Sequence, residues 1–301
     1  MDFHSNKVLI TGITGFTGLY LSKYFSNLNY DTYGISNRKN SSEKNIFHCD
    51  LLDKDGLEKI IADIQPNIII HLAAISFVGH EKTEDFYNVN VIGTQNLLEA
   101  IKNYGSNNIK KIILASSATV YGDQESYEHL SESMYPNPTN HYGISKFSME
   151  QIAKTYFNTL PIIITRPFNY TAPGQSIDFV IPKITTAFKN KQNIIELGNR
   201  NVFREYNSID FVTECYYKLA ISSHKSEIVN ICSGKTYSLE EVLDLCSEIT
   251  NHKLEVLINP NFVRKNEIFK LSGDPSKLYK MVKLGMRKFE LKDTLNLFLQ
   301  I

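Results

Sequence analysis

The chain has 301 residues, of which 42% are hydrophobic, a size and composition that suit one large domain with a smaller one. It contains no apolar run of 18 residues, so we expect no membrane span. Its 32 Lys and Arg residues balance its 32 Asp and Glu residues, and without a basic excess we expect no nucleic-acid partner.

The first predicted element is a strand at residues 8–10 that leads into a glycine-rich turn and then a helix. The spacing Gly-x-x-Gly-x-x-Gly differs from the Gly-x-Gly-x-x-Gly of most dinucleotide folds. Glycines here permit a tight turn and a close approach of backbone amides to a pyrophosphate. A turn without a ligand is the alternative, but strand, turn and helix in succession favour a dinucleotide site. The residues expected to contact the dinucleotide are Gly12, Thr14, Gly15, Phe16, Thr17 and Gly18.

The end of the second predicted strand bears on which dinucleotide binds. An acid there would accept hydrogen bonds from the adenosine ribose, but the chain has Ser36, Asn37 and Arg38. Cations and small polar side chains suit a 2′-phosphate, so NADP(H) is favoured and NAD(H) stays open; a solvated basic loop is the alternative. After a short third strand, the adenine is expected near Asp50 and Leu51. Asp50 would accept from the adenine amino group, or else only cap a helix.

A run of hydroxyl side chains follows the predicted strand at 111–113, beginning at Ser116 and Ser117. Side chains at the carboxyl edge of a parallel sheet open into the ligand crevice. Ser117 is therefore a candidate to hydrogen-bond a substrate oxygen. Serines after strands are commonplace, so this interpretation depends on the residues that follow.

Tyr142 and Lys146 lie four residues apart in a predicted helix, so the phenol and the ammonium share one face. This is the arrangement of an acid-base tyrosine, although the same spacing also occurs on ordinary helix faces. A phenol with a pKa near 10 transfers protons poorly at neutral pH, and a nearby cation favours its ionised form. We expect Lys146 and a positively charged nicotinamide to lower the pKa of Tyr142. A lowering by about 3 requires about 4 kcal/mol of differential interaction.

The second half of the chain alternates between the sheet and another unit. Residues 161–165 predict a sixth strand and 228–232 a strand that returns to the sheet, with a helix near 181–191 and a strand near 194–197 between them. We therefore predict an α/β fold: a Rossmann-type doubly wound parallel sheet with a smaller, discontinuous α+β substrate domain. The predicted boundaries are 1–169 and 207–235 for the dinucleotide-binding domain, and 170–206 and 236–301 for the substrate domain.

Taken in order, these motifs resemble the extended short-chain dehydrogenase/reductase family, which includes sugar-nucleotide epimerases, 4,6-dehydratases and 4-ketoreductases. The resemblance covers the whole chain. Its motifs are the glycine loop, His71-Leu72-Ala73-Ala74, Asn90-Val91-Ile92-Gly93-Thr94, Ser116 to Gly122, Tyr142-x-x-x-Lys146 and Arg166-Pro167-Phe168-Asn169. The resemblance implies that Ser117, Tyr142 and Lys146 form a catalytic triad, in which Lys146 also holds the nicotinamide ribose.

The resemblance also implies which residues contact each ligand. Further cofactor contacts are expected from Leu72, Ala73, Ala74, Asn90, Tyr142 and Lys146. Contacts to a sugar-nucleotide substrate are expected from Ser76, Ser117, Asn169, Lys183, Arg204, Arg264 and Glu267. Arg204 and Arg264 match positions that grip the diphosphate, for which a guanidinium is well suited, although a surface arginine is otherwise only solvated.

The reaction depends on what surrounds the triad. Ala118 and Thr119 stand where the family's 4,6-dehydratases carry a second acid-base residue, so dehydration is not expected. Epimerases of the UDP-galactose type usually have an acid after the second strand, which is missing here. Residues 34–36, 166–176 and 230–234 instead resemble GDP-4-keto-6-deoxymannose reductases.

We therefore predict an NAD(P)H-dependent reductase of the C4 keto group of a GDP- or dTDP-linked 4-keto-6-deoxyhexose. Its product would be a 6-deoxyhexose donor for surface polysaccharide. A nucleotide-sugar 4-epimerase is the alternative enzyme, and a cofactor-sensing regulator is the alternative without turnover.

The remaining expectations concern location and assembly. The four cysteines, at positions 49, 215, 232 and 246, lack the spacing of a metal site, which is typical of reduced thiols. The N-terminal segment has no signal-peptide character. We predict a cytoplasmic homodimer without a bound metal.

Overall fold

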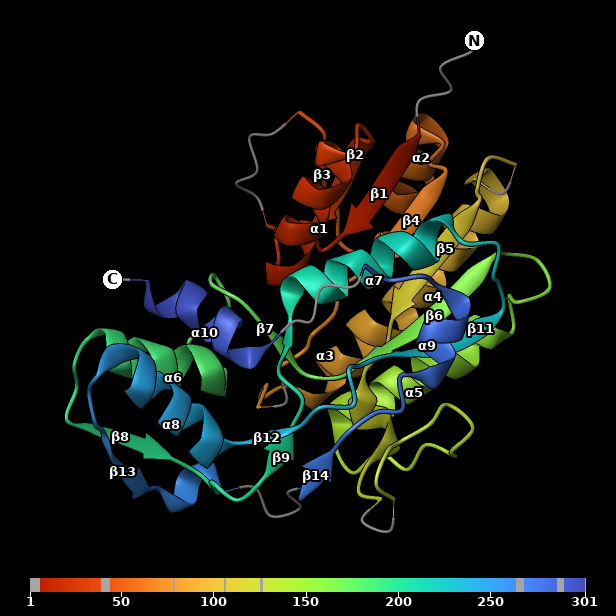
Figure 1. Ribbon diagram of the computed structural model, residues 1–301. Helices are drawn as coiled ribbons and strands as arrows, with labels where there is room; N and C mark the ends of the chain where they lie inside the picture. The colour runs from red at the N-terminus through yellow and green to blue at the C-terminus, as the bar shows by residue number, and fades with distance from the viewer. Residues whose placement is uncertain are drawn as a thin grey trace.

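A seven-stranded parallel sheet forms the centre of the molecule (Figure 1), with the strand order β11-β6-β5-β4-β1-β2-β3. The computed structural model describes residues 6–38, 44–77, 79–105, 107–124, 127–263, 268–285 and 290–300. The strands are β1 (Lys7–Thr11), β2 (Asp31–Ser36), β3 (Ile46–His48), β4 (Ile68–His71), β5 (Lys111–Ala115), β6 (Ile162–Pro167) and β11 (Glu227–Ile231). The order changes direction between β1 and β4, and open parallel sheets bind ligands at the carboxyl ends of the strands at such a point. The predicted doubly wound α/β fold is confirmed.

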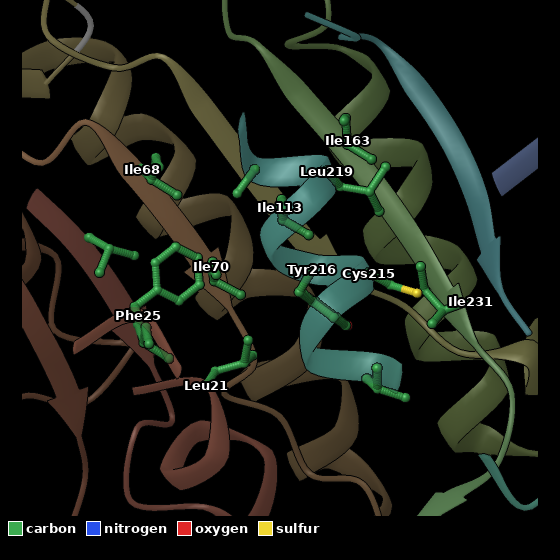
Figure 2. Close-up of a cluster of buried hydrophobic side chains, with 14 of the residues drawn as sticks. Leu21, Phe25, Ile68, Ile70, Ile113, Ile163, Cys215, Tyr216, Leu219 and Ile231 are labelled. Carbon is green, nitrogen blue, oxygen red and sulfur yellow. The ribbon is translucent and has the colours of Figure 1, made fainter. Parts of the chain in front are cut away.

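Helices cover both faces of this sheet. On one face lie α1 (Phe16–Asn27) and α7 (Ile209–Ile221), and on the other α2 (Lys54–Ile64), α4 (Gly93–Ala100) and α5 (His141–Lys154). Figure 2 shows α7 against the first face, where Tyr216 and Leu219 pack among isoleucines of the sheet, Ile113 included. The neighbours Ile112 and Leu114 point to the opposite face. Strands buried on both sides in this way are continuously apolar.

Helix α5 begins where its capping residue dictates. The side chain of Asn140 accepts a hydrogen bond from the Gly143 amide at 2.9 Å. This satisfies one of the free amides of the first turn. The cap therefore fixes Tyr142 in the first turn of α5, with Lys146 one turn further along the same face.

Most of the other elements gather beyond the carboxyl ends of the strands, and one short helix instead packs against the sheet beside β11. Three helices, α6 (Val180–Lys189), α8 (Leu239–Thr250) and α10 (Leu291–Leu299), enclose a separate hydrophobic core. The strand pairs around them are β7 (Tyr170–Thr171) with β10 (Asn207–Ser208), β8 (Ile194–Leu197) with β13 (Glu255–Ile258), and β12 (Tyr237–Ser238) with β9 (Phe203–Arg204), which also pairs with β14 (Lys270–Leu271). The short helices α3 (Thr83–Tyr87) and α9 (Ser276–Met281) complete the named helices. The predicted domain boundaries stay a prediction.

The helix expected near 181–191 forms as α6 but ends at Lys189. It stops there because Lys191 has a φ of 50°, a left-handed conformation that an α-helix does not contain. The β7–β10 and β9–β12–β14 pairings were not predicted. None of the helices in the described ranges combines the length and the apolarity needed to cross a membrane.

Candidate active site

The glycine turn between β1 and α1 is packed so closely that larger side chains would collide with backbone. Gly12 has a φ of 69°, and a Cβ added to it would lie 2.9 Å from the Ala73 nitrogen. A Cβ on Gly18 would lie 2.3 Å from the Gly12 carbonyl oxygen. The N-cap of α1, Gly15, provides no side-chain cap, and the first turn of α1 contains no acid. The first amides of α1 thus suit an anionic group such as a pyrophosphate.

A chain of hydrogen bonds holds the loop after β4 beside this turn. The Ala73 amide donates to Thr11 Oγ1 at 3.2 Å, and Thr11 Oγ1 lies 2.7 Å from His71 Nδ1. On the other side, His71 Nε2 lies 2.9 Å from Thr94 Oγ1, whose hydroxyl donates to the Asn90 carbonyl. Because the Thr94 proton is already donated, the Nε2 of His71 carries a proton and donates it to Thr94. Burial, the main cause, lowers the pKa of His71 to about 3.

Asn90 is 1% exposed and links the same loop to α5. Its Oδ1 accepts from the Ile75 amide at 2.9 Å, and its Nδ2 donates to the Ile75 carbonyl and to Ser145 Oγ. Ser145 Oγ in turn donates to the Tyr142 carbonyl at 2.8 Å. We predicted Asn90 as a cofactor contact. That contact stays a prediction; in the structure the Asn90 amide is bonded to the loop and to the helix around the site.

Ser117, Tyr142 and Lys146 come together at the carboxyl end of β5. Ser117 lies close enough to the Tyr142 phenol to lower its pKa. Lys146 is 4% exposed and donates from Nζ to the Ala115 carbonyl at 2.7 Å. The structure thus places these three residues at one strand end, and their role as a catalytic triad stays a prediction.

The pKa of Tyr142 departs from the expected direction. The protein raises it to about 12, because burial of the phenol outweighs the hydrogen bond with Ser117, which lowers it. Lys146 is held on the Ala115 carbonyl, and burial lowers its own pKa to about 8, against the opposing effect of Glu150. The prediction that Lys146 lowers the Tyr142 pKa is therefore wrong for the protein without its cofactor.

The end of β2 is organised around a buried hydroxyl. Ser36 is 3% exposed, and its Oγ lies 2.8 Å from Thr14 Oγ1 and accepts from the Arg38 amide at 3.1 Å. The side chains of Asn37 and Arg38 are exposed. Ser36 therefore shapes the turn, while Asn37 and Arg38 are the groups available to a ligand.

The adenine-side residues lie next to this turn. Asp50 is exposed and accepts from the Leu52 amide at 2.9 Å. Leu51 is buried, and its carbonyl accepts from Asn96 Nδ2 at 3.0 Å. Only the Asp50 carboxylate of this pair is therefore a polar group that a ligand can reach from solvent.

A contact that sequence reasoning missed joins α1 to the segment leaving the sheet after β6. Thr17 Oγ1 lies 2.7 Å from the Tyr170 hydroxyl, and the Phe16 and Tyr170 rings are stacked with centroids 6.2 Å apart. Tyr20 donates from its hydroxyl to the Pro173 carbonyl at 2.8 Å. The only signal in the sequence is the aromatic residue directly after Asn169.

The predicted substrate residues are spread over both units. Ser76 and Asn169 are exposed beyond the strand ends. Lys183, on α6, has its Nζ 3.9 Å from the centroid of the Phe262 ring, and Arg204, on β9, donates from Nη1 to the Phe203 carbonyl at 2.9 Å. Arg264 and Glu267 lie outside the described residues. Within the described ranges, no group of three or more His, Cys, Asp or Glu is arranged to hold a metal ion.

The sequence profile of the family described as GDP-mannose 4,6 dehydratase matches residues 9–288. This chain belongs to that family, within the extended short-chain dehydrogenases/reductases. A GDP-6-deoxy-D-talose 4-dehydrogenase of Aggregatibacter actinomycetemcomitans is 36% identical over 277 residues, which cover 90% of each chain. A GDP-6-deoxy-D-mannose reductase of Pseudomonas aeruginosa is 27% identical over 287 residues, covering 91% of this chain and 90% of that one. The solved structure of RMD from Pseudomonas aeruginosa, complexed with NADPH, superposes with a TM-score of 0.84 at 26% identity, over 98% of this chain and 97% of that one.

The family prediction is thus confirmed, and with it the prediction of an NAD(P)-dependent oxidoreductase. The residues described above fit a nicotinamide dinucleotide. Uncapped amides at the start of α1 suit the pyrophosphate, and the close backbone packing at Gly12 and Gly18 fixes the tight turn that leads into them.

Proposed function

We propose that this protein reduces the C4 keto group of a GDP- or dTDP-linked 4-keto-6-deoxyhexose with NAD(P)H. The observation that carries the proposal is the grouping of Ser117 and Tyr142 with the buried Lys146 at the carboxyl edge of the same sheet that carries the glycine turn. The relatives named as a GDP-6-deoxyhexose dehydrogenase and a GDP-6-deoxyhexose reductase support this choice of substrate class.

In this proposal, the cofactor when bound supplies a hydride to C4, and the protein manages the proton. A pKa of about 12 keeps Tyr142 protonated at neutral pH, so it is ready to give its proton to the alkoxide oxygen that forms at C4. Ser117 orients the carbonyl oxygen, and Lys146 holds the nicotinamide ribose. The positive charge of the oxidised nicotinamide would then favour the phenolate left on Tyr142.

A 4,6-dehydratase is disfavoured by the two residues after Ser117. Ala118 has no acid-base group, and the Thr119 hydroxyl donates to Ser117 Oγ at 2.9 Å. Elimination of water across C5 and C6 needs a second proton shuttle. We therefore do not assign to this chain the dehydration for which its family is named.

We further propose NADP(H) as the favoured cofactor. The exposed Asn37 and Arg38 side chains, with no acid at the end of β2, support binding of a 2′-phosphate. The complex of RMD with NADPH agrees with this choice. The predicted cytoplasmic location and homodimer stay predictions.

The test is stoichiometric. Purified protein should consume one NADPH per molecule of product formed from a 4-keto-6-deoxy sugar nucleotide, and deuteride from labelled NADPH should appear at C4. A panel of GDP-, dTDP-, UDP- and CDP-linked substrates would identify the base. Interconversion of UDP-hexoses without added cofactor and without label at C4 would instead establish a 4-epimerase.

A further inference from the structure

Behind the triad, a buried carboxylate fastens three elements together. Glu150 lies on α5 one turn after Lys146 and is 0% exposed. Its Oε1 accepts from Arg166 Nε at 2.9 Å and from Ser116 Oγ at 2.6 Å, and its Oε2 accepts from Arg166 Nη2 at 2.6 Å. The carboxylate therefore joins α5 to the residue directly before Ser117 and to β6.

The consequence for the triad is geometric. Ser116 and Ala115 precede Ser117 in the chain, and α5 bonds to both, through Glu150 to Ser116 and through Lys146 to the Ala115 carbonyl. The same helix carries Tyr142. We propose that Glu150 is a positioning residue, which through Ser116 and Arg166 sets the placement of Ser117 relative to Tyr142 and Lys146. This inference rests on the proposed function, in which those three groups act on one oxygen.

Glu150 also sets the charge around Lys146. The other titratable groups near the ammonium are Tyr142 on α5, protonated at neutral pH, and His71 on β4, which is neutral. Arg166, on β6, is paired with Glu150 at 2.6 Å. Glu150 is therefore the anion that opposes the loss of the Lys146 proton. Removing its charge should move the alkaline limb of the pH–rate profile to lower pH.

The network extends to the last strand of the sheet. The Arg166 guanidinium carbon lies 4.8 Å from the centroid of the Tyr121 ring, and the Tyr121 hydroxyl donates to Asn230 Oδ1 at 2.7 Å. The same contacts are expected if the Glu150–Arg166 pair serves only to stabilise the fold. Breaking one side of a buried pair leaves an uncompensated charge and destabilises, whereas replacing both sides by apolar residues is often tolerated. Comparing single and double replacements therefore distinguishes a positioning role of the pair from a role in stability alone.

Three variants use that difference. Glu150→Gln removes the charge and keeps one acceptor oxygen. The double variant Glu150→Leu with Arg166→Met removes the whole pair without leaving a lone buried charge. Lys111→Met is the matched control: Lys111 is 2% exposed, donates to the His224 carbonyl, and lies at the amino end of β5, opposite the triad.

We expect kcat to fall about 10- to 100-fold in both Glu150 variants, because a small misplacement of catalytic groups has effects of this size. The KM for NADPH should stay within a few-fold of the wild type. The double variant should have a melting temperature closer to that of the wild type than Glu150→Gln has, while its kcat stays low. Lys111→Met should keep the wild-type kcat and pH profile. Recovery of kcat together with stability in the double variant would show that the pair serves only the fold, and so would unchanged kcat and pH dependence in Glu150→Gln.

A second measurement needs no substrate. In protein labelled with [¹³Cζ]tyrosine, the Tyr142 signal, assigned with Tyr142→Phe, reports the hydrogen bond on the phenol. It should move in the double variant and stay in place in Lys111→Met. If no 4-keto sugar nucleotide is reduced by the wild type but this signal moves as expected, the proposed function fails and the positioning role stands. An unmoved signal overturns the positioning role.

Discussion

The Thr119 hydroxyl donates a hydrogen bond to Ser117 Oγ at 2.9 Å, and the Thr119 amide donates a second one at 3.2 Å. A serine hydroxyl accepts at most two hydrogen bonds and donates one. With both acceptor positions filled, Ser117 is left with its proton to donate, toward the Tyr142 phenol or a substrate oxygen. Thr119 therefore orients the hydroxyl that we assign to the carbonyl.

Thr119→Val should expose this role. Valine keeps the shape of threonine but loses the hydroxyl, so Ser117 gains a second rotamer and kcat should fall about 10-fold, equivalent to about 1.4 kcal/mol. Thr119→Ser restores the donor and is the control. The measurement is kcat at saturating substrate with thermal unfolding alongside. Wild-type kcat in Thr119→Val would mean that the amide of residue 119 suffices.

Tyr142→Phe removes the proposed proton donor while it keeps the aromatic ring. Turnover should fall by roughly 10²–10⁴. Cofactor affinity, followed by fluorescence titration of NADPH, should change little. Activity within a few-fold of the wild type would contradict the assignment of Tyr142 as the acid.

Arg38→Ala tests the proposed 2′-phosphate contact. Loss of a charge-assisted hydrogen bond should weaken NADPH by roughly 1.5–3 kcal/mol and leave NADH almost unchanged. Lys44→Ala removes another exposed cation near the same strand and serves as the control. Equal losses of affinity for both cofactors would show that Arg38 does not contact the 2′-phosphate.

The buried His71 should make the fold sensitive to mild acid. Its pKa is about 3 in the folded protein and 6.5 when unperturbed, so between these values the unfolded chain binds a proton that the folded chain does not. Stability is therefore lost as pH falls through this window, by about 2 kcal/mol between pH 7 and pH 5 from this group. Urea unfolding of wild type and His71→Gln at both pH values gives the comparison. The variant should lose less, and parallel losses would assign the acid sensitivity to other groups.

Much of the fold could be predicted from local sequence patterns. Strands buried on both faces are continuously apolar, as in residues 8–10, and the glycine turn has a spacing that packing enforces at Gly12 and Gly18. The group of Ser117, Tyr142 and Lys146 was predictable because one helical turn and one strand end bring them together.

The supporting contacts were less accessible from the sequence. The link between Glu150 and Arg166 joins elements whose contact depends on tertiary packing, and no local pattern marks it. The two-residue pairings such as β7–β10 are too short to show a period. In the protein alone the Tyr142 pKa is raised and not lowered, because spacing shows the nearby cation but not the depth of burial.

The position of α7 and β11 late in the chain has a consequence for synthesis. The first six strands of the sheet are complete by Pro167, but α7, which covers one face, and β11, which closes the edge of β6, follow only after α6 and β8. Until then, Ile113 and Ile163 have no cover from α7, and the edge of β6 is open for pairing with other chains. A truncated chain that ends at residue 169 should therefore aggregate when expressed alone. A fragment extended to residue 235 should aggregate less, because it contains α7 and β11.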